Sequence, residues 1–496
     1  MRMSCARRDA SVTRRHVSAP VVAYVVLTLA GCGGGGDSDM GPVTWSAATT
    51  PVPATINGGP WTLAQLAAGN PHPPSVPNKS YGYGKNFVAA NSGATSPMAP
   101  FYFPFLQGTG SDLQGYFDWR PKDINEGIVA AHSSDGGETW EFQQIVLVLT
   151  QAVPVNQQST NPDSGQADDG FGHPAVIRIP NAQPVIQPTP GAGQPWPTPI
   201  TTDTFLYTLD RSAGTVDKFG LVVTPLSPTA DLPLTGALPN VPIVVNDFTD
   251  ESRVLRTTGL LNPDGILGVV PGVYPLTILY VQKIGNGDAT GSTAVPPGQQ
   301  CQAQPYTPEG ANSPNPPNHD FVNVRIATTY NGVNFFDQGK VSGLHDPTAT
   351  SLIATRWISP GGTILDLGGG RFGLLFAGGN CMDADSDAFH YIGYAETTDP
   401  SLQTWTVLND LSNPIVSIGA HTLPVNGVQT VIPAHTPVVG PAQDEFAARV
   451  YSPSAIKLDD YTILLAFAGY HVQNPKDDLL DYRTVEIVKL KSSRRL

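Results

Sequence analysis

Residues able to do chemistry recur beside the prolines that open apolar segments of this chain. They are Asp169, Asp264, Glu445, Arg356, Arg449, His173 and Tyr451. Two carboxyl groups held across one cavity can serve as a general acid and as a base or nucleophile. Arg356 and Arg449 each stand four residues before a proline, and paired guanidinium groups suit the capture of a carboxylate or of several hydroxyl groups. Salt bridges between repeated units are the alternative interpretation of these arginines.

These positions follow a repeat of strands that runs through the chain. Each repeat opens with a polar residue and a proline: Ser96-Pro97, His173-Pro174, Asn262-Pro263, Ser359-Pro360 and Ser452-Pro453. Two apolar segments follow, and a third begins near Gly127, Phe219, Phe321, His390 and Arg483. Five such repeats predict an all-β fold, a single five-bladed β-propeller whose closure removes the sheet edges. A six-bladed propeller that uses residues 40–95 as a further blade is the alternative.

A short motif supports the propeller prediction. It is the stretch Ser133-Ser134-Asp135-Gly136-Gly137-Glu138-Thr139-Trp140, which resembles an Asp-box. Asp135 can accept backbone N–H bonds in a tight turn, Gly136 and Gly137 allow positive φ, and Trp140 begins the next strand. The resemblance implies a turn between the third and fourth strands of a propeller blade. Residues 328–335 and 398–405 carry weaker copies of the motif.

The final repeat resembles the last blade of sialidases. In that family a Tyr-Ser pair opens the inner strand and the tyrosine is the nucleophile, which a neighbouring carboxylate activates. Tyr451-Ser452 matches the pair, and Glu445 is the nearest carboxylate in the sequence. Arg178-Ile179-Pro180 matches a sialidase triplet in letters but follows its proline anchor, so we expect Arg178 to lie away from the channel mouth. A core tyrosine at position 451 is the alternative.

The repeats also resemble five-bladed glycosidases of the arabinanase and invertase type. These use carboxylates at the starts of several inner strands, and Asp169 and Asp264 occupy comparable places. The resemblance implies a glycoside hydrolase that acts on a glycan or another polyhydroxylated or anionic ligand. The triplet that usually carries the acid in these families is missing. A non-catalytic propeller that binds a carbohydrate or a partner is therefore the alternative function.

The N-terminus predicts export and a lipid anchor. Several arginines precede a short apolar run from Val21 to Leu29, too short to span a membrane, and Leu29-Ala30-Gly31-Cys32 resembles the bacterial lipobox. Residues 1–31 are then the signal peptide, 32–80 a tether and wrapping segment, and 81–496 the propeller, with Cys32 lipidated. Since Asp is absent directly after Cys32, the outer membrane is the favoured destination. A cleaved signal peptide without lipid is the alternative.

The net charge of the chain limits the binding partners that we expect. The formal net charge of −14 opposes binding to nucleic acid or to an anionic membrane surface, so we expect contact with the membrane only through the lipid. We also expect a monomer. Cys301 and Cys381 lie in loop-like segments of an exported chain and predict one disulfide. Asp383, Asp385 and Asp387 resemble the start of a calcium loop, but residue 388 is alanine and no Glu lies twelve along, so a solvated acidic loop and no cofactor are expected. A calcium site is the alternative.

Overall fold

The described part of the chain consists of β-strands and their turns. The computed structural model describes residues 43–53, 56–57, 101–119, 127–148, 171–179, 202–210, 220–227, 232–233, 241–242, 244–246, 263–270, 275–284, 321–346, 355, 357–359, 361–379, 391–417, 421–425, 428–432, 438, 449–470 and 483–496. Within these ranges there is no helix, so none that could cross a membrane. All of the strands belong to one unit, Pro42–Leu496.

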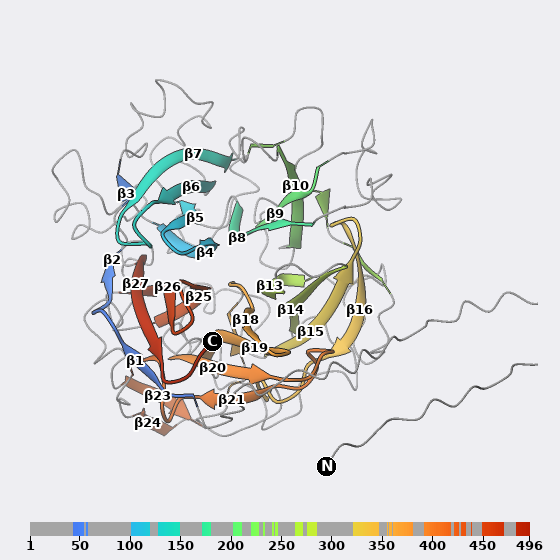
Figure 1. Ribbon diagram of the computed structural model, residues 1–496. Helices are drawn as coiled ribbons and strands as arrows, with labels where there is room; N and C mark the ends of the chain where they lie inside the picture. The colour runs from blue at the N-terminus through green and yellow to red at the C-terminus, as the bar shows by residue number, and fades with distance from the viewer. Residues whose placement is uncertain are drawn as a thin grey trace, which may run out of the picture. The chain divides into compact units, whose positions relative to one another are not determined.

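Five antiparallel sheets follow one another around a ring (Figure 1). Blade 1 contains β4 (Phe101–Thr109), β5 (Asp112–Trp119), β6 (Gly127–Ser133) and β7 (Trp140–Val148). Blade 2 contains β8 (Phe171–Arg178), β9 (Thr204–Asp210), β10 (Gly220–Leu226) and β11 (Val241–Pro242). Blade 3 contains β13 (Pro263–Val269), β14 (Leu276–Ile284), β15 (Phe321–Thr329) and β16 (Asn334–Lys340), with β12 (Val244–Asn246) parallel to β16 at its edge.

The last two blades complete the ring. Blade 4 contains β17 (Trp357–Ile358), β18 (Leu365–Gly368), β19 (Arg371–Gly379), β20 (Tyr391–Thr397), β21 (Thr406–Asn409) and β22 (Val416–Ser417). Blade 5 contains β25 (Arg449–Lys457), β26 (Thr462–Tyr470) and β27 (Arg483–Ser492), with β1 (Trp45–Ala47) and β2 (Val52–Pro53) along β27. β23 (His421–Val425) and β24 (Val428–Ile432) form a separate hairpin.

Five blades are therefore confirmed, and the six-bladed alternative is wrong. The described strands of this region, which the alternative needed for a sixth blade, instead form edge strands: β1 and β2 pair with β27, and β3 (Ile56–Asn57) pairs with β7. The expected starts of the third strands are also confirmed, since β6, β10, β15, β20 and β27 begin within one residue of the expected positions.

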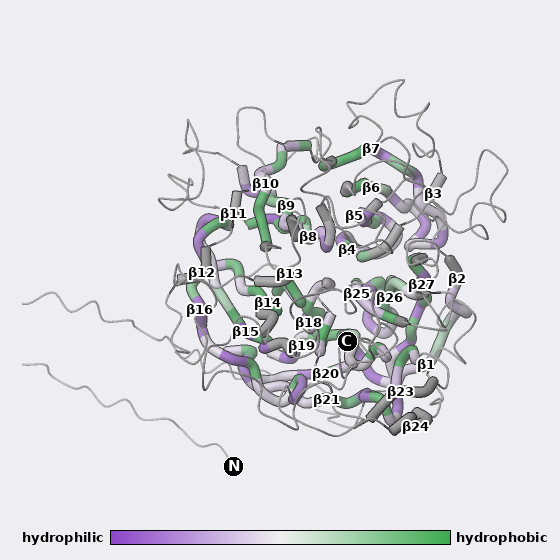
Figure 2. The backbone as a smooth tube through the Cα atoms, turned by 180° about the vertical axis from the view of Figure 1, so that it is seen from behind, coloured by the Kyte–Doolittle hydropathy of each residue, from purple (hydrophilic) through white to green (hydrophobic). Residues whose placement is uncertain are grey.

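Apolar side chains on both faces of the blades hold the ring together. One core cluster joins blades 3, 4 and 5 and includes Phe103 of blade 1, a second joins blades 1, 2 and 3, and a third joins blades 5 and 1. Central strands of the blades, such as β10, are accordingly nearly continuous apolar runs, because both of their faces pack against neighbouring blades. The outer strand β16 is more hydrophilic (Figure 2). Burial on both faces, and not a single amphipathic face, is what these sequences encode.

The motif turn has the geometry expected from its sequence. Asp135 Oδ1 accepts the N–H groups of Glu138 and Thr139, both at 2.9 Å, and its Oδ2 accepts the Thr139 hydroxyl at 2.6 Å. Gly136 and Gly137 have φ of 72° and 86°. A Cβ on Gly137 would lie 2.4 Å from Leu464 Cδ2, so this turn also packs directly on blade 5.

The two weaker copies of the motif form related turns in blades 3 and 4. Asn331 Oδ1 accepts the N–H groups of Val333 and Asn334 at 3.0 and 2.9 Å, as Asp135 does in blade 1. Asp399 Oδ2 accepts the N–H of Thr404 at 3.1 Å between β20 and β21. In the described outer hairpins of blades 1, 3 and 4, a side-chain oxygen within the turn thus accepts backbone N–H groups.

Asp135 is expected to make stability depend on pH below about 4. Desolvation alone would raise its pKa, but hydrogen bonds from Thr139, Ser133 and Glu138 outweigh this and lower it from 3.8 to about 2. A lowered folded-state pKa stabilises the fold above the unfolded value, and this contribution is lost as the pH falls from 3.8 through about 2. Tm measured from pH 5 to pH 2 should therefore fall more steeply for the native chain than for Asp135→Asn; parallel curves would contradict this role.

Blade 3 contains a buried ion pair. Arg325 Nε lies 2.9 Å from Asp337 Oδ1, and its NH2 group lies 2.6 Å from Oδ2, with both side chains 1% exposed. The hydroxyl of Tyr280 donates to Asp337 Oδ1 at 2.8 Å, and the N–H of Gly339 donates to Oδ2 at 3.1 Å. Burial and then the charge of Asp337 raise the pKa of Tyr280, which keeps this phenol protonated as a donor.

Candidate functional site at the propeller axis

Three inner strands share one backbone irregularity near their beginnings. β4, β8 and β25 each contain a β-bulge, in which the inner strand has one more residue than the strand paired with it. The bulges lie between Tyr102 and Phe105, between Gly172 and Ala175, and between Tyr451 and Ser454. Within these bulges Phe103, His173 and Ser452 have φ of 47°, 54° and 48°. A proline follows each of them and removes a backbone donor from the strand ladder. Positive φ is uncommon outside glycine and costs about 1–3 kcal/mol, so three blades retain the same strained element.

This arrangement corrects one sequence assignment. The expected anchor of the first repeat, Ser96-Pro97, lies outside the described residues, and the position equivalent to His173-Pro174 is Phe103-Pro104 on β4. The rule of a polar residue before the proline failed here. What the repeats share is the bulge and the proline that follows it, because these set the backbone path whatever side chain precedes them.

The bulges bring three aromatic rings together near the centre of the ring of blades. The ring centroids of Phe103 and His173 are 3.7 Å apart with an interplanar angle of 41°. Those of Phe103 and Tyr451 are 5.0 Å apart in an edge-on arrangement at 76°. Phe103 is 9% exposed, whereas His173 is half-buried. The inner strands of blades 5, 1 and 2 therefore meet through Phe103, a residue that the sequence analysis did not select.

Two serines join the fourth and fifth repeats at the bulge of β25. The hydroxyl oxygens of Ser359 and Ser452 are 2.9 Å apart, and the N–H of Ser452 donates to Ser359 Oγ at 3.0 Å. Both serines stand directly before the prolines that the sequence analysis took as equivalent. Behind Ser359, a Cβ on Gly362 would lie 2.7 Å from the carbonyl oxygen of Pro453, so only glycine lets the chains approach this closely.

Tyr451 is a packing residue in this structure. Its side chain is 2% exposed, its hydroxyl oxygen is buried, and its ring contacts Phe103. A phenol nucleophile must reach the anomeric carbon of a substrate, which requires an accessible oxygen. The structure thus places Tyr451 near the beginning of β25, with its ring in the aromatic cluster and its hydroxyl oxygen buried.

The other candidate residues are placed only in part. Asp264 is the second residue of β13, and a register shift between Pro263 and Gly265 leaves it as the bulge residue of blade 3. Arg449 begins β25, where its backbone pairs with Tyr470. Both residues therefore lie at the beginnings of inner strands, at the same end of the blades as the bulges. The remaining candidates lie outside the described residues: Asp169, Arg356, Glu445, Cys32, Cys301, Cys381 and the acidic run 383–387.

Two buried carboxylates near the bulges were missed by sequence reasoning. Asp118 is 0% exposed on β5 and pairs with Tyr102 directly before the bulge of β4. Glu486 is 1% exposed on β27 and pairs with Phe467. A buried carboxylate needs charged or hydrogen-bonding partners. The available signal was a single acidic residue inside an otherwise apolar strand, as in Tyr116-Phe117-Asp118-Trp119.

The connections at the two ends of the strands differ only in part. The inner strands β4, β8, β13 and β25 begin at one end, from which β5 is connected to β6, β7 to β8, β14 to β15, β19 to β20 and β26 to β27. At the opposite end, tight turns join β4 to β5, β18 to β19 and β25 to β26, whereas the connections from β8 to β9 and from β10 to β11 are long. Binding residues concentrate on loops held by a rigid scaffold, so the end with the bulges is the candidate functional face.

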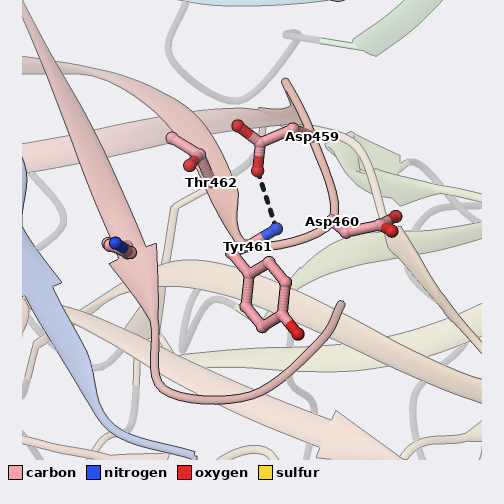
Figure 3. Close-up of a pocket in the computed structure, with 5 residues that line it drawn as sticks. Asp459, Asp460, Tyr461 and Thr462 are labelled. Atoms are coloured by element: carbon pink, nitrogen blue, oxygen red, sulfur yellow. Dashed lines mark hydrogen bonds between the residues drawn. The ribbon is translucent and has the colours of Figure 1, made fainter.

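A hollow of about 590 Å³ lies at the other end, on the β25–β26 turn (Figure 3). It is lined by Asp459, Asp460, Tyr461, Thr462 and Lys491. Asp459 Oδ1 accepts the N–H of Tyr461 at 2.7 Å, and this backbone bond is the main cause that lowers the pKa of Asp459. Asp460 pairs with Lys457 at 3.5 Å and Arg495 at 2.8 Å. These carboxylates therefore serve the turn and the surface ion pairs.

Arg178 lies away from the bulges, as expected from its position after the proline anchor. It ends β8, its side chain is 73% exposed, and its Nε lies 2.6 Å from Asp203 Oδ2. Among the described residues no group of three or more His, Cys, Asp and Glu side chains is arranged to hold a metal ion.

Fold and site together define a five-bladed β-propeller with a bulged, aromatic axis. No known protein family matches the sequence, and no curated protein matches it. Solved structures similar in fold include a thermostable family-43 glycoside hydrolase, 13% identical, with a TM-score of 0.40 over 80% of this chain and 93% of that one. A GH43_1 enzyme from Xanthomonas citri complexed with xylose is 11% identical, with a TM-score of 0.39 over 79% and 86% of the two chains. An endo-arabinase from Bacteroides thetaiotaomicron is 12% identical, with a TM-score of 0.37 over 78% and 93%. These structural neighbours are distant glycoside hydrolases. The activities named here are those of the neighbours.

Proposed function

We propose that the protein binds a glycan where its inner strands begin and hydrolyses it there. The observation that supports this most is the bulge shared by β4, β8 and β25, which brings the starts of three inner strands together around Phe103. Strained backbone retained at one position in several blades is typical of functional sites. Several connections between strands leave from this same end, and loops held on a rigid scaffold commonly carry binding residues.

The proposed chemistry uses carboxylates at the strand starts. Asp169, Asp264 and Glu445 are the candidates. One protonated carboxyl group gives its proton to the glycosidic oxygen as the bond to the leaving sugar breaks. A second, ionised carboxylate either attacks the anomeric carbon or removes a proton from the attacking water. Arg356, Arg449 and His173 would hold hydroxyl or carboxylate groups of the ligand, and we assign Tyr451 to the floor of the site because its hydroxyl is buried.

The setting of this activity is part of the proposal. Lipidated Cys32 anchors the chain to the bacterial envelope, with the outer membrane favoured, and a Cys301–Cys381 disulfide joins two loops of the exported protein. The protein acts as a monomer, needs no cofactor and does not bind nucleic acid, which its net charge of −14 opposes.

A propeller that binds a glycan without cleaving it is the second candidate. The burial of Tyr451 favours it, since this removes the phenol from the set of accessible nucleophiles. The same aromatic floor and arginines would then recognise a polymer without a pair of working carboxylates.

Asp264→Asn is expected to lower kcat/KM by about 10²–10⁴-fold, the usual contribution of a general acid or base. The measurement is a screen of the purified protein against aryl glycosides and polysaccharides, followed by kinetics on the best substrate. Asp112→Asn is the matched control, because Asp112 is 85% exposed at the opposite turn, where it pairs with His132. Its kinetics should equal those of the native chain.

Two results would decide between the candidates. Hydrolysis that is unchanged in Asp264→Asn and in the corresponding variants of Asp169 and Glu445 would refute the carboxylate assignment. Tight binding of a polysaccharide without any turnover, weakened by Arg449→Ala but not by Asp112→Asn, would establish the non-catalytic propeller.

A further inference from the structure

The turn between β25 and β26 presents an aromatic ring at the end of the blades opposite the bulges. Tyr461 is 46% exposed, more than any other large hydrophobic side chain in the described part of the chain. It lines the hollow on this turn, and Figure 3 shows its ring projecting from the backbone. The ring is thus a surface that a ligand can reach.

Three backbone N–H groups hold this turn in place. Asp459 Oδ1 accepts the N–H of Tyr461 at 2.7 Å. The carbonyl of Tyr461 accepts the N–H of Ser492, also at 2.7 Å. The carbonyl of Asp460 accepts the N–H of Leu496 at the same distance. The backbone that carries the ring is therefore fixed before a ligand binds, which lowers the entropy cost of binding.

An acceptor and a donor lie beside the ring. The N–H of Tyr461 and then the hydroxyl of Thr462 lower the pKa of Asp459 by hydrogen bonding, and the charge of Lys491 adds to this. Asp459 is therefore ionised at neutral pH, and a carboxylate has about four lone-pair sites, more than this turn occupies. Lys491 is exposed on β27 and lines the same hollow, so its ammonium group can donate to a ligand.

Charges of both signs surround the hollow. Asp460 Oδ1 lies 3.5 Å from Lys457 Nζ, and Asp460 Oδ2 lies 2.8 Å from the Arg495 guanidinium group. Such a surface does not select an ion of one sign. A neutral ligand rich in hydroxyl groups meets both signs favourably, because a hydroxyl can donate to a carboxylate and accept from an ammonium group.

A fixed aromatic ring with donors and acceptors at its side suits a sugar. The face of the ring is negative and attracts the weakly positive C–H groups of a sugar, whose hydroxyl groups then reach the charged side chains. The hollow of about 590 Å³ lies within the range of about 300–1,000 Å³ that is usual for small-ligand sites. We propose that Tyr461, Asp459 and Lys491 form a second carbohydrate-binding site, which holds a neutral glycan on blade 5.

This second site is separate from the axial site. The strand β25 joins the two, and at about 3.3 Å per residue the path from Ser452 to Lys457 is about 15–20 Å long. A sugar on the turn therefore does not touch the aromatic cluster around Phe103. The second site holds a polymer whether the axial site cleaves a glycan or only binds one, and it raises the local concentration of that polymer.

The test is affinity electrophoresis of the purified full chain in gels that contain arabinan, xylan or the anionic polymer polygalacturonate. We expect at least one neutral polymer to retard the native chain, and Tyr461→Ala to raise the apparent Kd about tenfold or more. Tyr461→Phe keeps the ring and should bind within about twofold of the native chain. Phe336→Ala should bind like the native chain. It is the matched control, since Phe336 is 37% exposed on β16 of blade 3.

Two further measurements separate the second site from the axial site. Hydroxyl-radical oxidation of Tyr461 in the native chain should fall when the retarding polymer is present, while oxidation of Phe336 stays the same. Tyr461→Ala should keep the native kcat/KM on a small aryl glycoside, because such a substrate occupies the axial site alone. Absence of hydrolysis in every chain would refute the axial activity, and the binding experiment would still decide on the second site.

Several outcomes would overturn the proposal. Equal retardation of Tyr461→Ala and the native chain would refute it, as would a native chain that neither neutral polymer retards. Retardation by polygalacturonate alone, abolished by Lys491→Ala but kept by Tyr461→Ala, would make the surface an anion site. Where Tyr461→Ala does not fold, Lys491→Ala on the exposed side chain provides the same comparison with the neutral polymers, with a smaller expected rise in Kd.

Discussion

Arg325→Met is expected to lower the free energy of unfolding by about 3–5 kcal/mol, the usual cost of removing one partner from a buried ion pair. Asp337 would remain in the interior, where its carboxylate is 1% exposed and loses two hydrogen bonds from the guanidinium group. The donors Tyr280 and Gly339 stay in place but do not neutralise the charge. Equilibrium denaturation in urea measures the loss.

A second variant separates charge from packing. Adding Asp337→Asn to Arg325→Met removes the stranded charge while keeping an oxygen that accepts from Tyr280, so at least half of the lost stability should return. Arg178→Ala is the control for an ion pair at the surface, since Arg178 is 73% exposed beside Asp203, and it should cost about 1 kcal/mol or less. A double variant no more stable than Arg325→Met would show that lost packing, and not the charge, is responsible.

Trp140→Ala is expected to cost a similar 3–5 kcal/mol, through the cavity left by a large buried ring. Trp140 is 0% exposed, its ring stands edge-on to Phe117 with centroids 5.7 Å apart, and it belongs to the cluster that joins blades 5 and 1. A Cβ on Gly115 would lie 2.8 Å from Trp140 Cζ3, which shows how closely the neighbouring strand approaches the ring. Thermal and urea denaturation should both report the loss.

The comparison with Trp405 tests the cause. Trp140 Nε1 is buried and has no hydrogen-bond partner among the described residues, whereas Trp405 Nε1 donates to the Leu402 carbonyl at 2.7 Å. Trp140→Phe should therefore lose only ring volume, while Trp405→Phe also loses a hydrogen bond worth about 1 kcal/mol. Equal losses in the two variants would contradict this account.

Much of the fold could be predicted because its elements are local. The starts of the third strands, such as those near Gly127 and Phe321, follow from apolar runs bounded by turn residues. The motif turn at Asp135 follows from side chains that bond the backbone two to four residues away. Such interactions depend on neighbours in the sequence and on no other part of the chain.

The first repeat shows where local reasoning failed. A search for a polar residue before proline selected Ser96-Pro97, whereas the bulge of blade 1 is built on Phe103-Pro104. The residue before the proline is chosen by what it meets across the axis, and Phe103 meets the rings of His173 and Tyr451. That choice depends on residues far away in the chain.

For the candidate site, the sequence by itself determined which residues stand at the starts of the inner strands, because strand periodicity and proline positions are local properties. His173, Asp264, Arg449 and Tyr451 indeed lie within the first three residues of β8, β13 and β25. Only the tertiary structure decided that Tyr451 is buried against Phe103, that Ser359 and Ser452 bond each other, and that β1 and β2 pair with β27. The physical reason is that these contacts join residues far apart in the sequence, so they form only when the blades close into a ring.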